Sequence, residues 1–387
     1  DIGLGPALAA RLRRELDLVI NCAGQVDFAP DLRRALSANV EAAFFLAAFV
    51  KRCARASLLH VSTCYVAGIR QGFIDELAHP AETPLGDPFD GEQERAEAHR
   101  AVERVFVEQQ SEEVGNALQR DLEELNRKRN GAPAEPRFVK AYSRRWMRER
   151  LIKEMVQVGK RRAQRLGWQN TYTYSKAMAE SLLHGNGRTL RHTLFRPSII
   201  ESALSFPFPG WNQGFNASAP LVYLLGTWFH GLPARKEVPF DVVPVDMVCR
   251  ALTVVGAALM LDRHAPVYHV GTSHLNRFTL GRACELTDLG HRRYLRARGK
   301  SSVERALLSR WDTRVVEPDG LLSVKNLRRA VEEMGALERD SPEIIRKRSR
   351  RAASRLQRTG KRLGEIERGE MRTVFNMGIG FAVVVSE

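Results

Sequence analysis

The sequence predicts an α/β fold with a doubly wound parallel sheet, that is, a sheet covered by helices on both faces. Two short apolar runs, residues 17–24 and 58–63, end in small or hydroxyl side chains, as buried parallel strands that feed loops do. The stretch between them, residues 32–55, repeats apolar positions at helical spacing. Strands that alternate with helices in this way are typical of parallel sheets.

A long, charge-dense stretch then interrupts this alternation. Residues 92–165 have helical character and are acidic at first and strongly basic later. Pro133 and Pro136 are expected to break the stretch into at least two helices, because proline cannot continue a helix interior. The alternation resumes with a predicted helix over residues 172–184 and a predicted strand over residues 192–200.

The last third of the chain predicts fewer regular elements. Residues 206–214 form a loop rich in proline and glycine, and residues 241–260 form a short extended entry into an apolar helix. Residues 341–370 are expected to form an Arg-rich helix with little apolar face.

The composition narrows the class of protein. Sixty Lys and Arg residues against 45 Asp and Glu residues give a net charge of +15, which favours phosphate-bearing small molecules, an anionic membrane surface or nucleic acid. The longest apolar stretches, residues 221–229 and 251–261, are too short to span a bilayer. Five cysteines without CxxC spacing, and no signal peptide, predict free thiols in a reducing compartment and hence a cytoplasmic location. The spacing of the histidines indicates no metal site.

Tyr172 and Lys176 are the strongest local signal for chemistry. Their spacing of four places both side chains on one face of a predicted helix. A phenol is a poor acid at neutral pH, but a neighbouring ammonium stabilises the phenolate, so we expect Lys176 to lower the pKa of Tyr172. Tyr172 could then donate a proton to an oxygen while hydride reaches the adjoining carbon. The same spacing in an ordinary helix is usually only a solvated tyrosine and lysine.

Two strand ends supply further candidates. Ser62 and Thr63 follow the predicted strand at residues 58–63, and ligands of doubly wound sheets bind beyond the carboxyl ends of the strands. A hydroxyl there could hydrogen-bond a substrate carbonyl, or it could merely cap the following turn. Cys22, Ala23 and Gly24 end the preceding strand, where small residues either admit a flat adenosine or form a tight turn.

Together with further motifs, these features resemble the fatty acyl-CoA reductases, the male-sterility group of the extended short-chain dehydrogenases. The resemblance runs from Asp1 to about Asn276. The matching segments are Asp1-Ile2, NCAGQVDF at residues 21–28, Ala38-Asn39-Val40, HVSTCYVAG at 60–68, NTYTYSKAMAE at 170–180, RPSII at 196–200 followed by PFPGW at 207–211, and VPVDMV at 243–248. Several moderately specific motifs in one order are far more specific than the Tyr-Lys spacing alone.

The resemblance implies roles for particular residues. Thr63, Tyr172 and Lys176 would form the catalytic set, with Ser62 beside them, and Asn39 would help to hold a water linked to Lys176. Pro197 and Ser198 would face the nicotinamide, and Asp1, Ala23 and Gly24 would line the adenosine. The full implied cofactor site is Asp1, Ile2, Cys22, Ala23, Gly24, Asn39, Lys176, Arg196, Pro197, Ser198 and Ile199.

The sequence departs from the family pattern in two places. The glycine-rich turn that cradles a pyrophosphate belongs upstream of Asp1, and Gly3 and Gly5 do not replace it because they lie too close to the strand at residues 17–24. The choice of NADPH as cofactor is therefore implied by the family alone. The insertion between Gly72 and Gln169 is much longer than a minimal member needs, and it could cap the substrate or face a membrane.

The resemblance also implies a division of this Rossmann-like chain. We expect a core at residues 1–72 that lacks its first strands, a charged helical insertion at 73–168, and a continuation of the core with the substrate-binding region at 169–280. A basic helical region at 281–387, cut short at its end, would follow.

The implied activity is NADPH-dependent reduction of a long-chain fatty acyl-CoA thioester to an aldehyde, an alcohol or both. Three alternatives stay open: reduction of an acyl chain bound to a carrier protein, epimerisation or dehydration of a nucleotide sugar, and a non-enzymatic module that binds a membrane surface. The expected partners are an acyl-CoA or acyl-carrier thioester and an anionic membrane surface. Nucleic acid is not expected, since no RNA-binding motif or zinc knuckle occurs.

Overall fold

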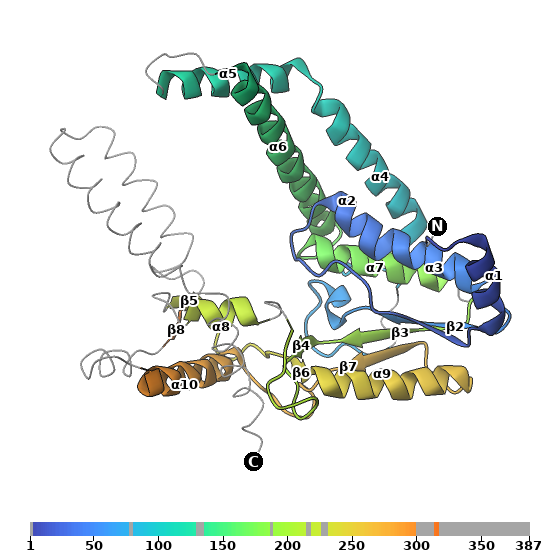
Figure 1. Cartoon of the computed structure of the whole chain (residues 1–387). Coiled ribbons are helices and arrows are strands. Elements are labelled where there is room, and N and C mark those ends of the chain that lie inside the picture. Colours follow the sequence, from blue (N-terminus) through green and yellow to red (C-terminus); the bar gives the residue numbers. More distant parts are fainter. Residues whose placement is uncertain are drawn as a thin grey trace. The chain divides into compact units, whose positions relative to one another are not determined.

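The structure is a computed structural model, and it describes residues 3–76, 80–128, 135–185, 189–213, 218–225, 231–298 and 313–316 (Figure 1). The chain divides into two compact units. The first comprises Asp1–Pro197 with Leu252–Val270, and the second comprises Ser198–Ala251 with Gly271–Glu387. The domain boundaries expected at residues 72, 168 and 280 stay a prediction. Asp1, Ile2 and the expected helix at 341–370 lie outside the described residues.

The first unit is built on a four-stranded parallel sheet. Its strands lie in the order β1 (Leu18–Asn21), β2 (Ser57–Val61), β3 (His192–Pro197) and β7 (Val267–Val270). The register places Asn21 beside His60 and Val61 beside Phe195, so the carboxyl ends of the strands meet at one edge. The predicted parallel sheet is confirmed.

Helices cover both faces of this sheet. On one face, α1 (Pro6–Glu15), α3 (Ala42–Val50) and α7 (Thr171–Gly185) enclose a core that includes Leu58 and Leu194. Leu59 points to the other face because side chains alternate along a strand. There the part of α9 (Val245–Met260) that belongs to this unit approaches the sheet, and a Cβ added at Gly256 would lie 3.1 Å from Leu18 (Figure 1). The sheet is therefore doubly wound.

The helix predicted over residues 32–55 is a composite. It runs as α2 (Leu32–Ala35), a π-helical turn η1 (Leu36–Glu41) and α3. Asp31 caps the start by accepting the backbone N–H of Arg33 at 3.0 Å. The helix ends at Val50, earlier than predicted. The N–H groups of Arg52 and Cys53 bond three residues back, to the carbonyls of Phe49 and Val50, and that of Ala54 bonds to the carbonyl of Arg13.

The predicted charged stretch forms three described helices, α4 (Gly91–Glu108), α5 (Glu112–Lys128) and α6 (Pro136–Arg165). Pro136 begins α6, as expected for a proline that cannot sit inside a helix. A break at residues 109–111, between α4 and α5, contains no proline and was not predicted. We call these three helices the arm.

The arm joins the sheet unit through a buried polar cluster. Glu94 on α4 accepts hydrogen bonds from Arg162 on α6, at 3.0 and 2.7 Å, and from the hydroxyl of Tyr174 on α7. Glu94, Arg162 and Tyr174 are all buried. Around them, apolar residues of η1, α4, α6 and α7 form one core, which includes Val40, Ala98, Ala163 and Met178.

The second unit contains shorter elements. Its strands pair as β4 (Ile199–Glu201) with β6 (Val242–Pro244) and as β5 (Gly231–Pro233) with β8 (Arg314–Val316). The described part also contains α8 (Ala219–Leu225), α10 (Leu280–Arg298) and the start of α9. The predicted strand at residues 192–200 is thus two strands. β3 stops at Pro197, which has no N–H with which to continue a ladder.

None of the described helices combines the length and apolar character needed to cross a membrane.

Candidate active site

The site is built at the edge of the sheet where β1 and β2 end. Ser62 follows β2, and its N–H donates to Phe195 of β3 at 2.7 Å. Thr63 begins the short 3-10 helix η2 (Cys64–Ala67), and its hydroxyl accepts the N–H of Tyr65 at 3.3 Å. The capping role considered for this hydroxyl is therefore present. Both side chains are buried, and no hydrogen-bond partner contacts the Ser62 hydroxyl within the described residues.

Helix α7 carries Tyr172 and Lys176 toward the same edge. Asn170 caps this helix by accepting the N–H of Thr173 at 2.9 Å, so its first turn is held in place. The hydroxyl of Thr63 is hydrogen-bonded to that of Tyr172. The Tyr172 ring also lies 6.2 Å from that of Phe28, which belongs to the loop after β1.

The electrostatics of Tyr172 differ from the sequence-based expectation. Burial raises the pKa of the phenol above its ordinary value, and the hydrogen bond from Thr63 offsets only part of this effect. Lys176 is not among the groups that act on the phenol. The expectation that Lys176 lowers the pKa of Tyr172 is wrong for this structure, because burial disfavours the phenolate more strongly.

Lys176 is almost fully enclosed, with 4% of its surface exposed. Its ammonium donates to the carbonyl of Val61 at 3.0 Å, which ties α7 to the end of β2. Burial lowers the pKa of this lysine to about 8, against the opposing effect of Glu180 and Cys22. Lys176 is thus mainly charged at neutral pH, but its pKa lies close enough to neutral pH for a small rise in pH to remove the charge.

Asn39 and Gly24 complete this edge. The Asn39 side chain accepts the N–H of Gln25 at 2.7 Å and donates to the carbonyl of Gln25 at 3.1 Å and to Ser175 at 2.8 Å. A Cβ on Gly24 would lie 2.8 Å from the Asn39 oxygen and 3.0 Å from the Lys176 nitrogen. The absence of a side chain therefore lets the backbone approach the two polar groups.

The other predicted cofactor residues are spread more widely. Cys22 and Ala23 lie exposed beyond the end of β1. Arg196 is buried on β3, where it pairs with Glu180 of α7 and approaches the Nε2 atom of His269 at 3.2 Å. Pro197 ends β3 in the first unit, whereas Ser198 and Ile199 belong to the second. Asp1 and Ile2 are not described, and the roles predicted for all of these residues stay predictions.

His60 also lies at this edge, although the sequence motifs indicated no role for it. This residue is fully buried on β2, and its Nδ1 atom lies 3.1 Å from the amide nitrogen of Asn21 on β1. Burial lowers its pKa far below the ordinary value, and the nearby Lys176 charge acts in the same direction, so His60 is neutral. A histidine inside an otherwise apolar strand was the available signal.

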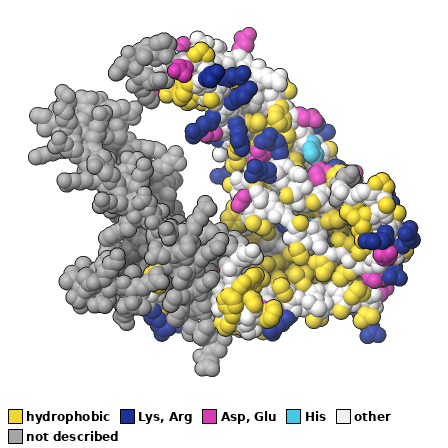
Figure 2. Space-filling model, viewed as in Figure 1, with side chains coloured by type: hydrophobic (Ala, Val, Ile, Leu, Met, Phe, Trp, Pro, Cys, Tyr) yellow, Lys and Arg dark blue, Asp and Glu magenta, His cyan; other side chains and the backbone are white. Residues whose placement is uncertain are grey.

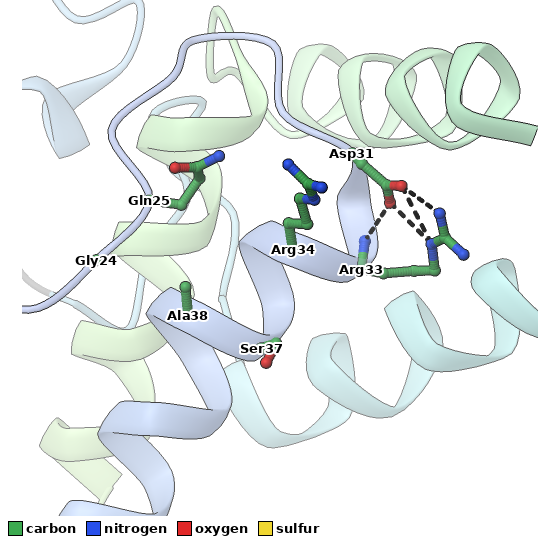
Figure 3. A pocket seen from close by; sticks show the side chains of 7 residues that line it. All are labelled: Gly24, Gln25, Asp31, Arg33, Arg34, Ser37 and Ala38. Carbon is green, nitrogen blue, oxygen red and sulfur yellow. Dashed lines mark hydrogen bonds and ion pairs between the residues drawn. The ribbon is translucent and has the colours of Figure 1, made fainter. Parts of the chain in front are cut away.

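A cavity of about 570 Å³ opens beside Gly24. It is lined by Gly24, Gln25, Asp31, Arg33, Arg34, Ser37 and Ala38, which come from the loop after β1 and from the helix that follows (Figure 3). The backbone of Gln25 is fixed by Asn39, so this wall is joined directly to the neighbourhood of Lys176.

The comparisons with a family model and with curated proteins point to the same family. Residues 1–252 match the model of the NAD-binding male sterility protein. The probable fatty acyl-CoA reductase 5 of Arabidopsis thaliana is 32% identical over 288 residues, which cover 72% of this chain and 50% of that protein. The alcohol-forming fatty acyl-CoA reductase of Simmondsia chinensis is 29% identical over 290 residues, which cover 74% of this chain and 51% of that protein.

A human relative and one solved structure extend the comparison. Fatty acyl-CoA reductase 2 of Homo sapiens is 32% identical over 149 residues, which cover 37% of this chain and 27% of that protein. The terminal R domain from the myxalamid biosynthetic pathway aligns with a TM-score of 0.43 and 16% identity, over 79% of this chain and 59% of that chain. That likeness adds nothing to the family assignment.

The chain spans about half the length of the plant relatives named above. Because the family model covers residues 1–252, the chain belongs to the male sterility protein family, and the relatives that it matches are named fatty acyl-CoA reductases.

Proposed function

We propose that the protein reduces a long-chain fatty acyl-CoA thioester with NADPH, to the aldehyde, the alcohol or both. The observation that carries the proposal is the meeting of Thr63, Tyr172 and Lys176 at one sheet edge in a chain of this family. The names of the relatives support the substrate class, and the family model supports a nicotinamide cofactor.

Each residue has a distinct part in this chemistry. When bound, a reduced nicotinamide cofactor would supply the hydride that reduces the thioester carbonyl carbon. Tyr172 donates its proton to the carbonyl oxygen, and it stays protonated until then because its pKa is raised. Thr63 donates a hydrogen bond to the phenol oxygen and so stabilises the phenolate that remains. The Lys176 ammonium, held by Val61, adds positive charge to the same region. The Tyr172 phenolate then takes back the hydroxyl proton as the resulting hemithioacetal collapses, which releases the aldehyde and expels the thiolate.

The described residues fit a dinucleotide. Gly24 has no Cβ, and a Cβ there would crowd Asn39 and Lys176. The hydroxyl of Ser62 is buried and has no hydrogen-bond partner among the described residues. We assign Cys22, Ala23, Gly24 and Asn39 to the dinucleotide site together with Lys176. NADPH rather than NADH is proposed from the family alone.

Replacement of Tyr172 by Phe tests the proposal. In a protein that also carries the glycine-rich turn expected upstream of Asp1, we expect Tyr172→Phe to lower acyl-CoA-dependent NADPH oxidation by about 10²- to 10⁴-fold, the usual contribution of a general acid, and to change NADPH binding by no more than about threefold. Tyr142→Phe is the matched control. It also removes a phenol hydroxyl, but this hydroxyl lies on the arm, where it donates a hydrogen bond to Asp121. Near-normal turnover by Tyr172→Phe would refute the assigned role.

The thioester donor is a separate question. We propose acyl-CoA as the donor, in line with the relatives, over an acyl chain on a carrier protein. Parallel assays with the same acyl chain on coenzyme A and on a carrier protein decide between them, since the preferred donor gives the higher kcat/KM.

We further propose that the arm rests on an anionic membrane surface, into which long acyl chains partition. Four exposed basic residues of α6, Arg137, Lys140, Arg144 and Arg148, recur every three or four positions and so share one side of the helix. Figure 2 shows Lys and Arg side chains gathered over the part of the view where the arm lies. Each such residue near an anionic surface contributes about 1 kcal/mol.

A further inference from the structure

The cavity beside Gly24 contains one arginine whose charge is not compensated. Its two arginines differ: Arg33 donates to both carboxylate oxygens of Asp31, at 3.0 and 3.2 Å from its Nε atom. The Arg34 side chain makes no hydrogen bond or ion pair with any residue in the described part of the chain, and it is exposed. Asp31 is already occupied, so Arg34 leaves the cavity with an unpaired positive charge.

The geometry directs that charge into the cavity. Figure 3 shows the side chains of Arg34 and Gln25 both extending into the space below the loop that joins Gly24 to Asp31, while Arg33 turns to Asp31. The amide of Gln25 is held by Asp27 at 2.9 Å, and its backbone is held by Asn39. Gln25 is therefore held in place before any ligand arrives, which lowers the entropic cost of binding at this wall.

The chemistry of such a site favours phosphate. A guanidinium presents several N–H donors in one plane and binds phosphate oxygens with two parallel hydrogen bonds, which are among the stronger ones in proteins. The volume of about 570 Å³ lies within the range of roughly 300–1,000 Å³ that small-molecule sites occupy. Gly24 forms one wall and also adjoins the Lys176 nitrogen, so a ligand in the cavity would reach the catalytic edge.

We propose that this cavity is a subsite for a phosphate group of an adenine nucleotide, and that Arg34 is its binding residue. The proposal rests on the proposed function only for the choice of nucleotides, because coenzyme A and NADPH both carry phosphates on an adenosine. Arg34 is a binding residue here and takes no part in proton transfer.

Calorimetric titration of the full chain with coenzyme A and with NADPH tests the proposal. Arg34→Ala is expected to weaken binding of the nucleotide that uses the cavity by about ten- to a hundredfold, which corresponds to the loss of a charged hydrogen bond. Arg34→Lys should restore part of the affinity, since lysine keeps the charge but not the planar fork. Arg52→Ala is the matched control, because Arg52 is exposed just beyond the other end of the same helical stretch.

The ligands distinguish the source of the phosphate. Loss of affinity for coenzyme A alone assigns the cavity to the thioester head group, and loss for NADPH alone assigns it to the cofactor. 3′-Dephospho-coenzyme A and NADH then show whether the ribose phosphate or the pyrophosphate is bound. Affinities unchanged by Arg34→Ala for both nucleotides, or a wild-type chain that binds neither, overturn the proposal. Binding through Arg34 without any acyl-CoA reduction would refute the proposed function and leave this subsite standing.

Discussion

Lys176 is a charged side chain placed where its charge is costly. Its pKa of about 8 lies more than two units below the ordinary value for lysine because the side chain is buried, although Glu180 and Cys22 favour the charged form. Tyr172 has a pKa raised above its ordinary value and remains a proton donor throughout the neutral and mildly alkaline range. The first group to titrate as pH rises is therefore the lysine and not the tyrosine.

This difference predicts the pH dependence of the reaction. As pH rises through about 8, Lys176 loses its proton and with it the positive charge that it adds beside the reacting oxygen, so kcat/KM should fall on the alkaline side. Lys176→Arg keeps a charge at every accessible pH, so the alkaline fall should move upward or vanish. Lys176→Gln should be slow at all pH values and lack this limb. Rate profiles between pH 6 and about pH 10 provide the measurement, and an alkaline limb common to all three proteins would contradict the role.

At the scale of elements, α7 is the point where the arm and the sheet meet. Tyr174 faces the arm through Glu94 and Arg162, and Glu180 faces the sheet through Arg196 of β3. These contacts, one with the arm and one with the sheet, hold α7 in place and so position Tyr172 and Lys176 on the same helix. Burial and the Glu94 carboxylate raise the pKa of Tyr174, so this phenol stays neutral and its hydroxyl donates a hydrogen bond to Glu94.

The buried cluster should therefore carry a large part of the stability of this region. We expect Arg162→Met to lower the free energy of unfolding by about 3–5 kcal/mol, because it leaves Glu94 buried without its charged partner. Combining it with Glu94→Gln should cost less than the sum of the two single changes, since both remove the same interaction. Urea unfolding followed by circular dichroism measures all three variants.

Arg145→Met is the matched control for this cluster. It breaks an ion pair on the same helix, with Glu149, but both side chains are largely exposed. Exposed pairs contribute little because water screens them, so the variant should unfold like the wild type. Additive losses in the Glu94 and Arg162 variants would mean that the two side chains act independently.

At the scale of the whole molecule, the proposed membrane contact of the arm can be measured directly. The full chain should sediment with vesicles that contain phosphatidylserine and not with pure phosphatidylcholine, and salt should weaken the binding. Changing Arg137, Arg144 and Arg148 together to Ala should reduce binding severalfold. The matched triple change of Lys160, Arg161 and Arg165, exposed at the other end of α6, should have a smaller effect. Equal losses in both triple variants would point to net charge alone.

Much of the fold could be predicted from local pattern. The short apolar runs at residues 17–24 and 58–63 became β1 and β2, and Pro136 became the first residue of α6, because strand burial and proline geometry act over a few residues. The split of residues 192–200 into two strands was missed, although Pro197 marks where the first strand ends; the pairing of the two halves with different strands, β7 and β6, depends on residues distant in the sequence. Apolar pattern does not encode such pairing.

The sequence predicted which residues form the site better than it predicted their pKa values. The order of the motifs brought Thr63, Tyr172 and Lys176 into consideration, but the raised pKa of Tyr172 comes from burial by residues distant in the sequence. The cluster of Glu94, Arg162 and Tyr174 joins positions 12 to 80 residues apart, so no local spacing in the sequence predicts it. Three-dimensional burial decides both features.

The π-helical turn at Leu36–Glu41 has a consequence for the evolution of chain length in this family. Deleting one residue there would restore ordinary winding and rotate one side of the helix against the other by about 100°. Either Asn39 would leave Gln25 and Ser175, or Ala43 and Ala47 of α3 would turn out of the core. The number of residues from Asp31 to Val50 is therefore more tightly constrained than the identity of the exposed side chains in this segment. In this segment, selection should therefore act against insertions and deletions far more strongly than against substitutions at the surface.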